Sequence, residues 1–194
     1  MSTTISRRLA LGVGAASVAI VGVAGLASSA LFTSQDTSTG NSFTTGTVAI
    51  NTGAGAAVFT VANMAPGDVN YGKVPVANDG SLELRYAMTS SSSNTDSKGL
   101  ASTLTAKVVA VPSAATCDAA AIPGGTAIYS GALSNAAFGS TAAGNQSGDR
   151  TLAANSGEAL CVEVTFPKAA SNGVQGAATS TTLTFDAEQT LHNA

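Results

Sequence analysis

The stretch Leu82-Glu83-Leu84-Arg85-Tyr86-Ala87-Met88 decides the fold class of this chain. Large apolar residues occupy every second position of it, and charged or small residues lie between them. A period of two is typical of a β-strand with one face in the core and the other in water. We therefore predict a strand here, with Arg85 and Ala87 on its solvent-exposed face.

The same alternation recurs elsewhere in the chain, at residues 104–110, 160–166 and 183–187. Further runs have the composition of strands, at residues 43–50, 58–61, 71–77 and 128–133. Amphipathic helices of ten residues or more are not recognisable after residue 30. Many short strands with turns between them predict an all-β fold, an antiparallel β-sandwich or jelly roll formed by one domain at residues 43–194.

Three local signals refine this prediction. Asn78-Asp79-Gly80 is typical of a hairpin turn between two paired strands. Pro75 lies inside one of the strand runs, which indicates an edge strand or a bulge. Residues 113–155 are small, rich in glycine and without a clear period, so the sequence predicts only a short strand or turn there.

The N-terminus has the features of an export signal. Arg7 and Arg8 precede an uncharged run of small and apolar residues, 9–27. A basic segment, an apolar segment and small residues at the end are typical of a cleaved signal peptide at residues 1–30, with Ser28 and Ala30 placing the cut between Ala30 and Leu31. A transmembrane anchor is the alternative, because the run is close to the length that spans a bilayer. The paired arginines also resemble a twin-arginine signal.

Composition limits the possible partners. Only 10% of the residues are charged, and the formal net charge is −3. Removal of Arg7 and Arg8 with the leader would bring the net charge to about −5, which argues against binding to nucleic acids or to anionic membranes.

The two cysteines, Cys117 and Cys161, lie in the part of the chain that would be exported. An oxidising compartment favours a disulfide between them, and two free thiols are the alternative. On the chain-entropy model such a bond would stabilise the fold by about 4 kcal/mol.

We find little sign of catalytic chemistry. His192 is the only histidine, and it lies at the end of the chain, where it is poorly placed to act as a base or metal ligand. There is no H-E-x-x-H motif. We expect the acidic residues of the strands to be solvated; they are Glu83, Glu163, Asp186 and Glu188. We also expect two surface ion pairs, Arg85 with Glu83 and Arg150 with Asp149. The sequence thus predicts no catalytic residue, no cofactor and no metal.

Four segments, in this order along the chain, resemble the TasA/camelysin family of exported bacterial surface proteins. They are the leader from Leu11-Gly12-Val13-Gly14 to Ala30-Leu31-Phe32-Thr33, then Phe43-Thr44-Thr45-Gly46-Thr47-Val48-Ala49-Ile50, then Asn63-Met64-Ala65-Pro66-Gly67-Asp68 with Asn78-Asp79-Gly80-Ser81-Leu82, and last Gln175-Gly176 with Leu183-Thr184-Phe185-Asp186-Ala187-Glu188-Gln189. The leader is similar to those cut by the family's own signal peptidase, SipW.

The resemblance implies a secreted jelly-roll subunit of fibres in the biofilm matrix or on the surface of a Gram-positive bacterium. Its partners would be other copies of itself, joined head to tail, the signal peptidase during export, and other components of the matrix or cell wall. In TasA-like fibres the N-terminal segment of one subunit adds as a strand to the next subunit. Here that arm, residues 31–42 with Phe43 as its end, would consist of Phe32, Thr33, Ser34, Gln35, Asp36, Thr37, Ser38, Thr39, Gly40, Asn41, Ser42 and Phe43.

Two other functions remain open at this point. The name camelysin implies a secreted metallopeptidase, although no catalytic residue of such an enzyme can be assigned in this sequence. A monomeric adhesion or binding domain at the cell surface would fit the same strand pattern, with an arm that does not assemble.

Overall fold

The structure is a computed structural model that describes residues 45–53 and 63–191. All of these residues belong to one compact unit, Phe43–Ala194. The predicted leader, the cleavage site, the arm, the strand run 58–61 and His192 lie outside the described residues.

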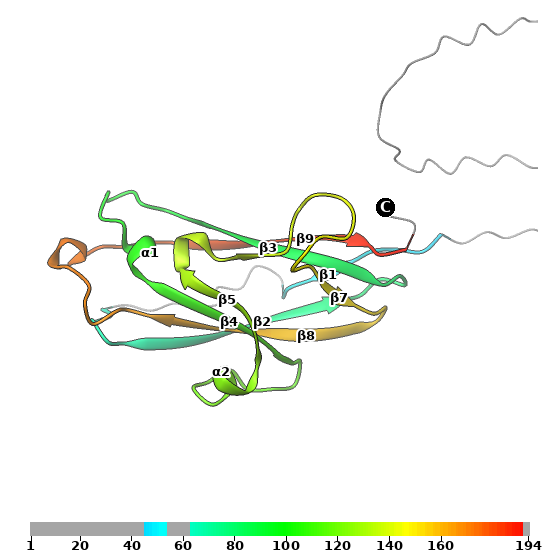
Figure 1. The fold of residues 1–194 in the computed structure, drawn as a ribbon, viewed down its shortest axis with the longest axis horizontal. Coiled ribbons are helices and arrows are strands. Elements are labelled where there is room, and N and C mark those ends of the chain that lie inside the picture. The colour runs from blue at the N-terminus through cyan, green and yellow to red at the C-terminus, as the bar shows by residue number, and fades with distance from the viewer. Residues whose placement is uncertain (1–44, 54–62, 192–194) are drawn as a thin grey trace, which may run out of the picture. The chain divides into compact units, whose positions relative to one another are not determined.

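The described residues form two layers of antiparallel β-sheet (Figure 1). Their strands are β1 (Ile50–Asn51), β2 (Val69–Asn78), β3 (Leu84–Ser92), β4 (Thr105–Pro112), β5 (Thr126–Ala132), β6 (Ala137–Phe138), β7 (Arg150–Leu152), β8 (Ser156–Thr165) and β9 (Thr181–Gln189). The helices in this part of the chain are single turns, α1 (Leu100–Thr103), α2 (Ala121–Gly124), η1 (Leu133–Asn135) and η2 (Asn172–Val174). The predicted all-β sandwich is confirmed.

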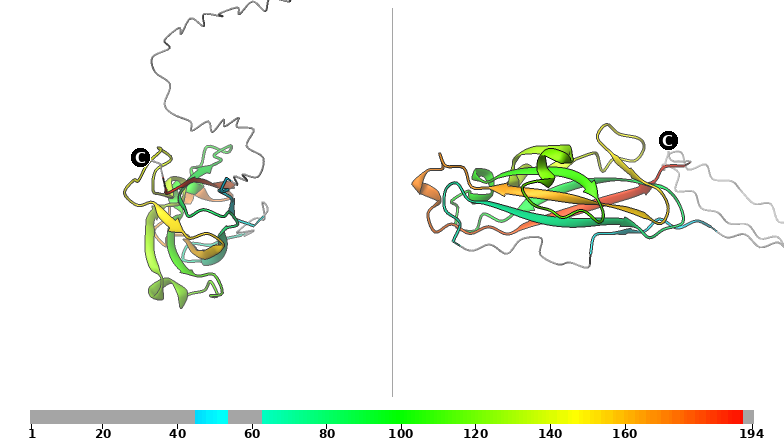
Figure 2. Two further views of the ribbon diagram at one scale, coloured as in Figure 1. Left: turned by 90° about the vertical axis from the view of Figure 1, so that its right-hand side faces the viewer. Right: turned by 90° about the horizontal axis from the view of Figure 1, so that it is seen from below.

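The first sheet has the order β1-β2-β8-β4-β5, and the second places β3 between β9 on one side and β6 and β7 on the other. All pairs are antiparallel, and Figure 2 shows the two sheets from the end and from below. The predicted strands at 71–77, 82–88, 104–110, 128–133, 160–166 and 183–187 all correspond to strands of the structure. The predicted strand 43–50 is largely wrong, because residues 45–49 form no strand and only Ile50 belongs to β1.

The core lies between the sheets. Apolar residues of β2, β3, β4 and β8 fill it, and Leu84, Met88 and Leu160 are fully buried. The ring of Tyr86 meets that of Phe138 edge to face, with 5.6 Å between ring centroids. Alternation in the sequence therefore identified the inward faces correctly, since each strand sends every second side chain into this layer.

The prediction that the outer face of β3 is exposed to solvent is wrong. Arg85 and Ala87 are 5% and 1% exposed, because the connection from β6 to β7 folds over the outer side of β3. Gly139 permits this close approach, since it adopts a φ of +68° and a Cβ placed on it would lie 3.0 Å from the Cβ of Ala87. A loop that is distant in sequence covers this face, and no period in the strand itself could reveal it.

The hairpin predicted at Asn78-Asp79-Gly80 is also wrong. β2 ends at Asn78 and β3 begins at Leu84, but the two strands belong to different sheets and do not pair. Asn78 is 1% exposed, and its amide donates to the carbonyls of Leu82 and Leu152 at 2.8 and 3.1 Å. These residues do form a turn, but the turn connects a strand of one sheet to a strand of the other sheet.

Pro75 lies on the outer side of β2. Phe166 N–H donates to the Asp68 carbonyl, so in the regular ladder that follows, the even-numbered residues of β2 direct their backbone groups to β8. Pro75 therefore faces away from β8, where its missing N–H interrupts no bond of that ladder. In the described part of the chain β1 covers this side of β2 only opposite Ala77 and Asn78.

Candidate functional site

Glu83 and Glu163, two of the acidic residues considered for catalysis, have different surroundings. Glu83 accepts a hydrogen bond from the hydroxyl of Thr190, at 2.7 Å. Glu163 of β8 lies opposite Lys107 of β4 and Tyr71 of β2. The pKa of the Tyr71 hydroxyl is raised, first by desolvation and then by the charge of Glu163. Within residues 45–53 and 63–191, no three histidine, cysteine or acidic side chains come together as a metal site.

The arginines have other partners than the sequence predicts. Arg85 pairs with Glu188 of β9 at 2.5 Å, not with Glu83. Glu188 also accepts the backbone N–H of Gly144 at 3.0 Å, so this pair fastens the β6–β7 connection over the outer face of the second sheet. The hollow at this place measures about 210 Å³, and Arg85 and Glu188 line it together with Asp149 and Asp186.

A second polar cluster joins the two sheets. Glu158 of β8 accepts hydrogen bonds from the Tyr86 hydroxyl at 2.5 Å and from Arg150 Nε at 2.8 Å, and its other oxygen lies 2.5 Å from Arg150 Nη2. Burial, and then the hydrogen bond to Glu158, raise the pKa of the Tyr86 hydroxyl well above its usual range. The sequence prediction paired Arg150 with its neighbour Asp149, because only the fold brings Glu158 within reach.

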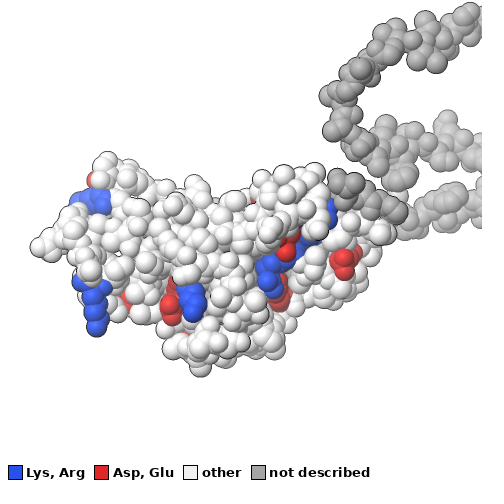
Figure 3. Space-filling model, viewed as in Figure 1, with Lys and Arg blue, Asp and Glu red and all other residues white. Residues whose placement is uncertain are grey.

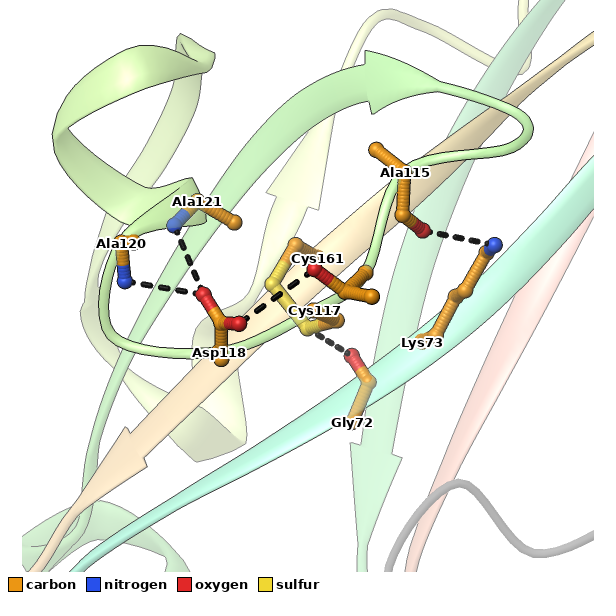
Figure 4. The surroundings of a disulfide bond; sticks show 9 residues. Gly72, Lys73, Ala115, Cys117, Asp118, Ala120, Ala121 and Cys161 are labelled. Atoms are coloured by element: carbon orange, nitrogen blue, oxygen red, sulfur yellow. Dashed lines mark hydrogen bonds between the residues drawn. A yellow bond between two sulfur atoms is a disulfide. The ribbon is translucent and has the colours of Figure 1, made fainter.

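The two cysteines form a disulfide on the outer face of the first sheet (Figure 4). Their Cα atoms are 5.2 Å apart. The bond holds the loop of residues 113–125 against β8, where a second small apolar cluster forms from Val109, Val111, Ile122, Ala159 and Cys161. The ammonium of Lys73 donates to the carbonyls of Ser113 and Ala115 at 2.6 and 2.8 Å, which fixes the start of the loop.

Several strands of the sandwich have a partner on one side only among the described residues. They include β5, which pairs with β4, and β2, whose outer side is paired with β1 at Ala77 and Asn78 alone. An open edge presents backbone N–H and C=O groups that a guest strand can pair. These edges are therefore a candidate site for contact with a further strand.

β9 pairs with β3 over nine residues without a register shift, from Ser92↔Thr181 to Leu84↔Gln189. Leu183, Phe185 and Ala187 point towards the core but are only half-buried, whereas Thr182 and Thr184 are exposed. The ring of Phe185 lies 6.3 Å from that of Tyr86. The edge of the core is thus incompletely covered beside β9.

The visible surface is mostly uncharged. Figure 3 shows scattered basic and acidic side chains on a large neutral area. Among the described residues, no helix is long and apolar enough to cross a membrane. A surface of this kind fits the low content of charged residues in the sequence.

Comparison with known proteins identifies the family. The family model described as camelysin metallo-endopeptidase matches residues 4–194. No curated protein matches the chain. Since the match extends over almost the entire sequence, the chain belongs to the TasA/camelysin family.

Proposed function

We propose that this protein is a secreted structural subunit of extracellular fibres in the biofilm matrix or on the cell surface. Each subunit donates its N-terminal arm, Phe32 to Phe43, as a strand to the next subunit. The observation that carries the proposal is the antiparallel sandwich, in which strands such as β5 have a partner on one side only among the described residues. A donated strand pairs its backbone with such an edge and covers apolar groups that are otherwise half-exposed.

The arrangement gives a filament rather than a closed dimer. The donor precedes the sandwich in sequence, and the acceptor is an edge of the sandwich itself, so donor and acceptor are different surfaces. A contact between two different surfaces repeats indefinitely unless its rotation closes a ring. Family membership supports this function, and the leader at residues 1–30 supports export.

Electron microscopy and size-exclusion chromatography test the proposal. The chain beginning at Leu31 is compared with one beginning at Phe43, at the same concentration. We expect filaments from the longer chain and monomers from the shorter one. Filaments from both would rule out the arm as the linker, and monomers from both would favour a monomeric adhesion domain.

A second candidate, a secreted metallopeptidase, is favoured by the description of the matching family model. It predicts stoichiometric zinc in the purified protein and cleavage of casein that a chelator abolishes. Metal analysis and a casein assay on the chain from Leu31 decide this directly, because a protein without zinc that leaves casein intact is not such an enzyme.

A further inference from the structure

The disulfide lies beside an apolar surface that is separate from the core (Figure 4). Val109 and Val111 of β4 and Ala159 of β8 are 0 to 7% exposed. They point away from the core, because the residues next to them in each strand belong to the core cluster. The loop of residues 113–125 covers this outer face, and its Ile122 packs among these side chains. The face is therefore shielded from water while the loop lies on it.

Hydrogen bonds contribute little to holding the loop on the sheet. Among the described residues, and apart from local bonds at the two ends of the loop, those that reach it from the sheet start at the ammonium of Lys73 and end at the carbonyls of Ser113 and Ala115. The Sγ of Cys117 lies 3.1 Å from the Gly72 carbonyl oxygen, but a disulfide sulfur has no proton to donate. The loop is thus tied at its start by one side chain and in its middle by the disulfide.

The packing of the loop against the sheet is also incomplete. The carboxylate of Asp118 accepts the N–H groups of Ala120 and Ala121, so its hydrogen bonds stabilise the turn within the loop and not the contact with the sheet. A hollow of about 330 Å³ remains where the loop meets Val111 at the end of β4. The disulfide is therefore the main tie between the loop and the sheet.

We propose that the disulfide between Cys117 and Cys161 is a redox-sensitive latch. Its reduction releases the loop of residues 113–125 and exposes the apolar outer face of β4 and β8, while the sandwich stays folded. The two parts separate because the covered cluster and the core share no residue and lie on opposite faces of the first sheet. Oxidising surroundings outside the cell keep the latch closed. The inference goes beyond the proposed function and does not require the arm.

A dithiol reductant supplies both electrons that open the latch. Cys161 is fully buried and Cys117 is half-buried, so the attacking thiolate reaches the sulfur of Cys117. The S–S bond breaks, a mixed disulfide forms at Cys117, and Cys161 leaves as a thiolate that takes up a proton. The second thiol of the reductant then displaces Cys117, which also takes up a proton. The protein gains two electrons and two protons, and the dithiol becomes a cyclic disulfide.

Alkylation of Cys161 measures the opening of the loop. The chain that begins at Leu31 is reduced with dithiothreitol and treated with excess iodoacetamide, and mass spectrometry follows the modified fraction of each cysteine over time. Since a thiol reacts only where the reagent reaches it, we expect Cys161 to react within about tenfold of the rate of Cys117. A reduced protein in which Cys117 is modified and Cys161 stays free would overturn the proposal, because the loop would then remain closed.

Cleavage by subtilisin tests whether the opening is confined to the loop. This serine protease cuts exposed, flexible segments, and a dithiol does not inhibit it. After reduction we expect cleavage within residues 113–125 to become about tenfold faster or more, while β3 and β8 stay intact. Cleavage throughout the chain would show that the bond holds the whole fold together. That result, or an unchanged rate within the loop, would overturn the latch.

A double variant controls for other actions of the reductant. Cys117→Ser combined with Cys161→Ala should be cleaved in the loop at the rate of the reduced wild type, with and without dithiothreitol. A response of this variant to dithiothreitol would assign the effect to another action of the reagent. An unfolded variant would show that the sandwich needs the bond, and either outcome would contradict the proposal.

Two lysine variants separate the disulfide from the remaining tie. Lys73→Gln removes the ammonium that holds the start of the loop, and Lys107→Gln removes one from the same face of the sheet, opposite Glu163. While the disulfide is intact, we expect subtilisin to cut the loop of both variants as slowly as that of the wild type. Faster cleavage in oxidised Lys73→Gln alone would assign the closing of the loop to Lys73 and overturn the disulfide as the latch.

Discussion

At the scale of single residues, Tyr86 makes the stability of the fold depend on pH. Its pKa is raised by burial and by the hydrogen bond to Glu158, so the folded protein keeps the phenolic proton at a pH where the unfolded chain loses it. The contribution is complete below about pH 10 and is lost as the pH rises above it. We expect unfolding free energy to fall by up to about 1.4 kcal/mol per pH unit there.

Urea denaturation at pH 8 and pH 11 measures this loss. Tyr86→Phe has no proton to lose at this position, so its stability should fall less between the two pH values than that of the wild type. The same fall in both proteins would show that Tyr86 does not cause it. Tyr71, whose pKa is also raised, remains in both and supplies the common background.

Asn78 is a second single residue on which stability depends, because its side chain stabilises the turn that connects β2 to β3. Its amide donates to three carbonyls, those of Leu82, Leu152 and Ala153, and its oxygen accepts the N–H of Gly80. Asn78→Ala leaves these backbone groups without their partner in a buried place, which should lower the unfolding free energy by about 2 to 3 kcal/mol.

The exposed Asn145 provides a matched control for this substitution. Asn145→Ala should change the unfolding free energy by less than about 0.5 kcal/mol, as is usual for surface positions. Both values come from denaturant titrations at neutral pH. A loss at residue 78 that is no larger than the loss at residue 145 would contradict the role assigned to Asn78.

At the scale of elements, the disulfide holds the loop of residues 113–125 on the first sheet. Replacing Cys117 and Cys161 by alanine should cost up to about 4 kcal/mol on the chain-entropy model. Hydrogen exchange in the loop should also accelerate more than in β3 and β9, which belong to the other sheet. Equal acceleration in all three places would mean that the bond stabilises the whole fold without a local effect on the loop.

Elements also show how far the sequence could predict the structure. Strands such as β8 and β9 were predictable because alternation records their inward faces directly. The outward faces were not, because loops from distant parts of the chain cover Arg85, Ala87 and Cys161. The partner of Arg150 was hidden for the same reason, since only the packing of the sheets places Glu158 beside it.

Of the two parts of the candidate site, the sequence predicts the donor strand but not the edge that accepts it. The arm is visible in the sequence as a polar segment between two phenylalanines. The edges that could accept it are not visible, because the sequence does not show which strands have a partner on one side only among the described residues. Sheet order is set by contacts between distant segments, and alternation within a strand carries no information about it.

At the scale of the whole molecule, net charge opposes assembly. The chain from Leu31 has a net charge of about −5, so identical subunits repel each other, and the arm carries only Asp36. The proposed joint consists mainly of backbone hydrogen bonds between neutral groups, which salt screens little. Raising sodium chloride from about 20 to about 200 mM shortens the screening length from about 20 to about 7 Å and should therefore speed fibre growth. Light scattering at constant protein concentration measures the lag time, and slower growth at high salt would show that attraction between opposite charges holds the subunits together.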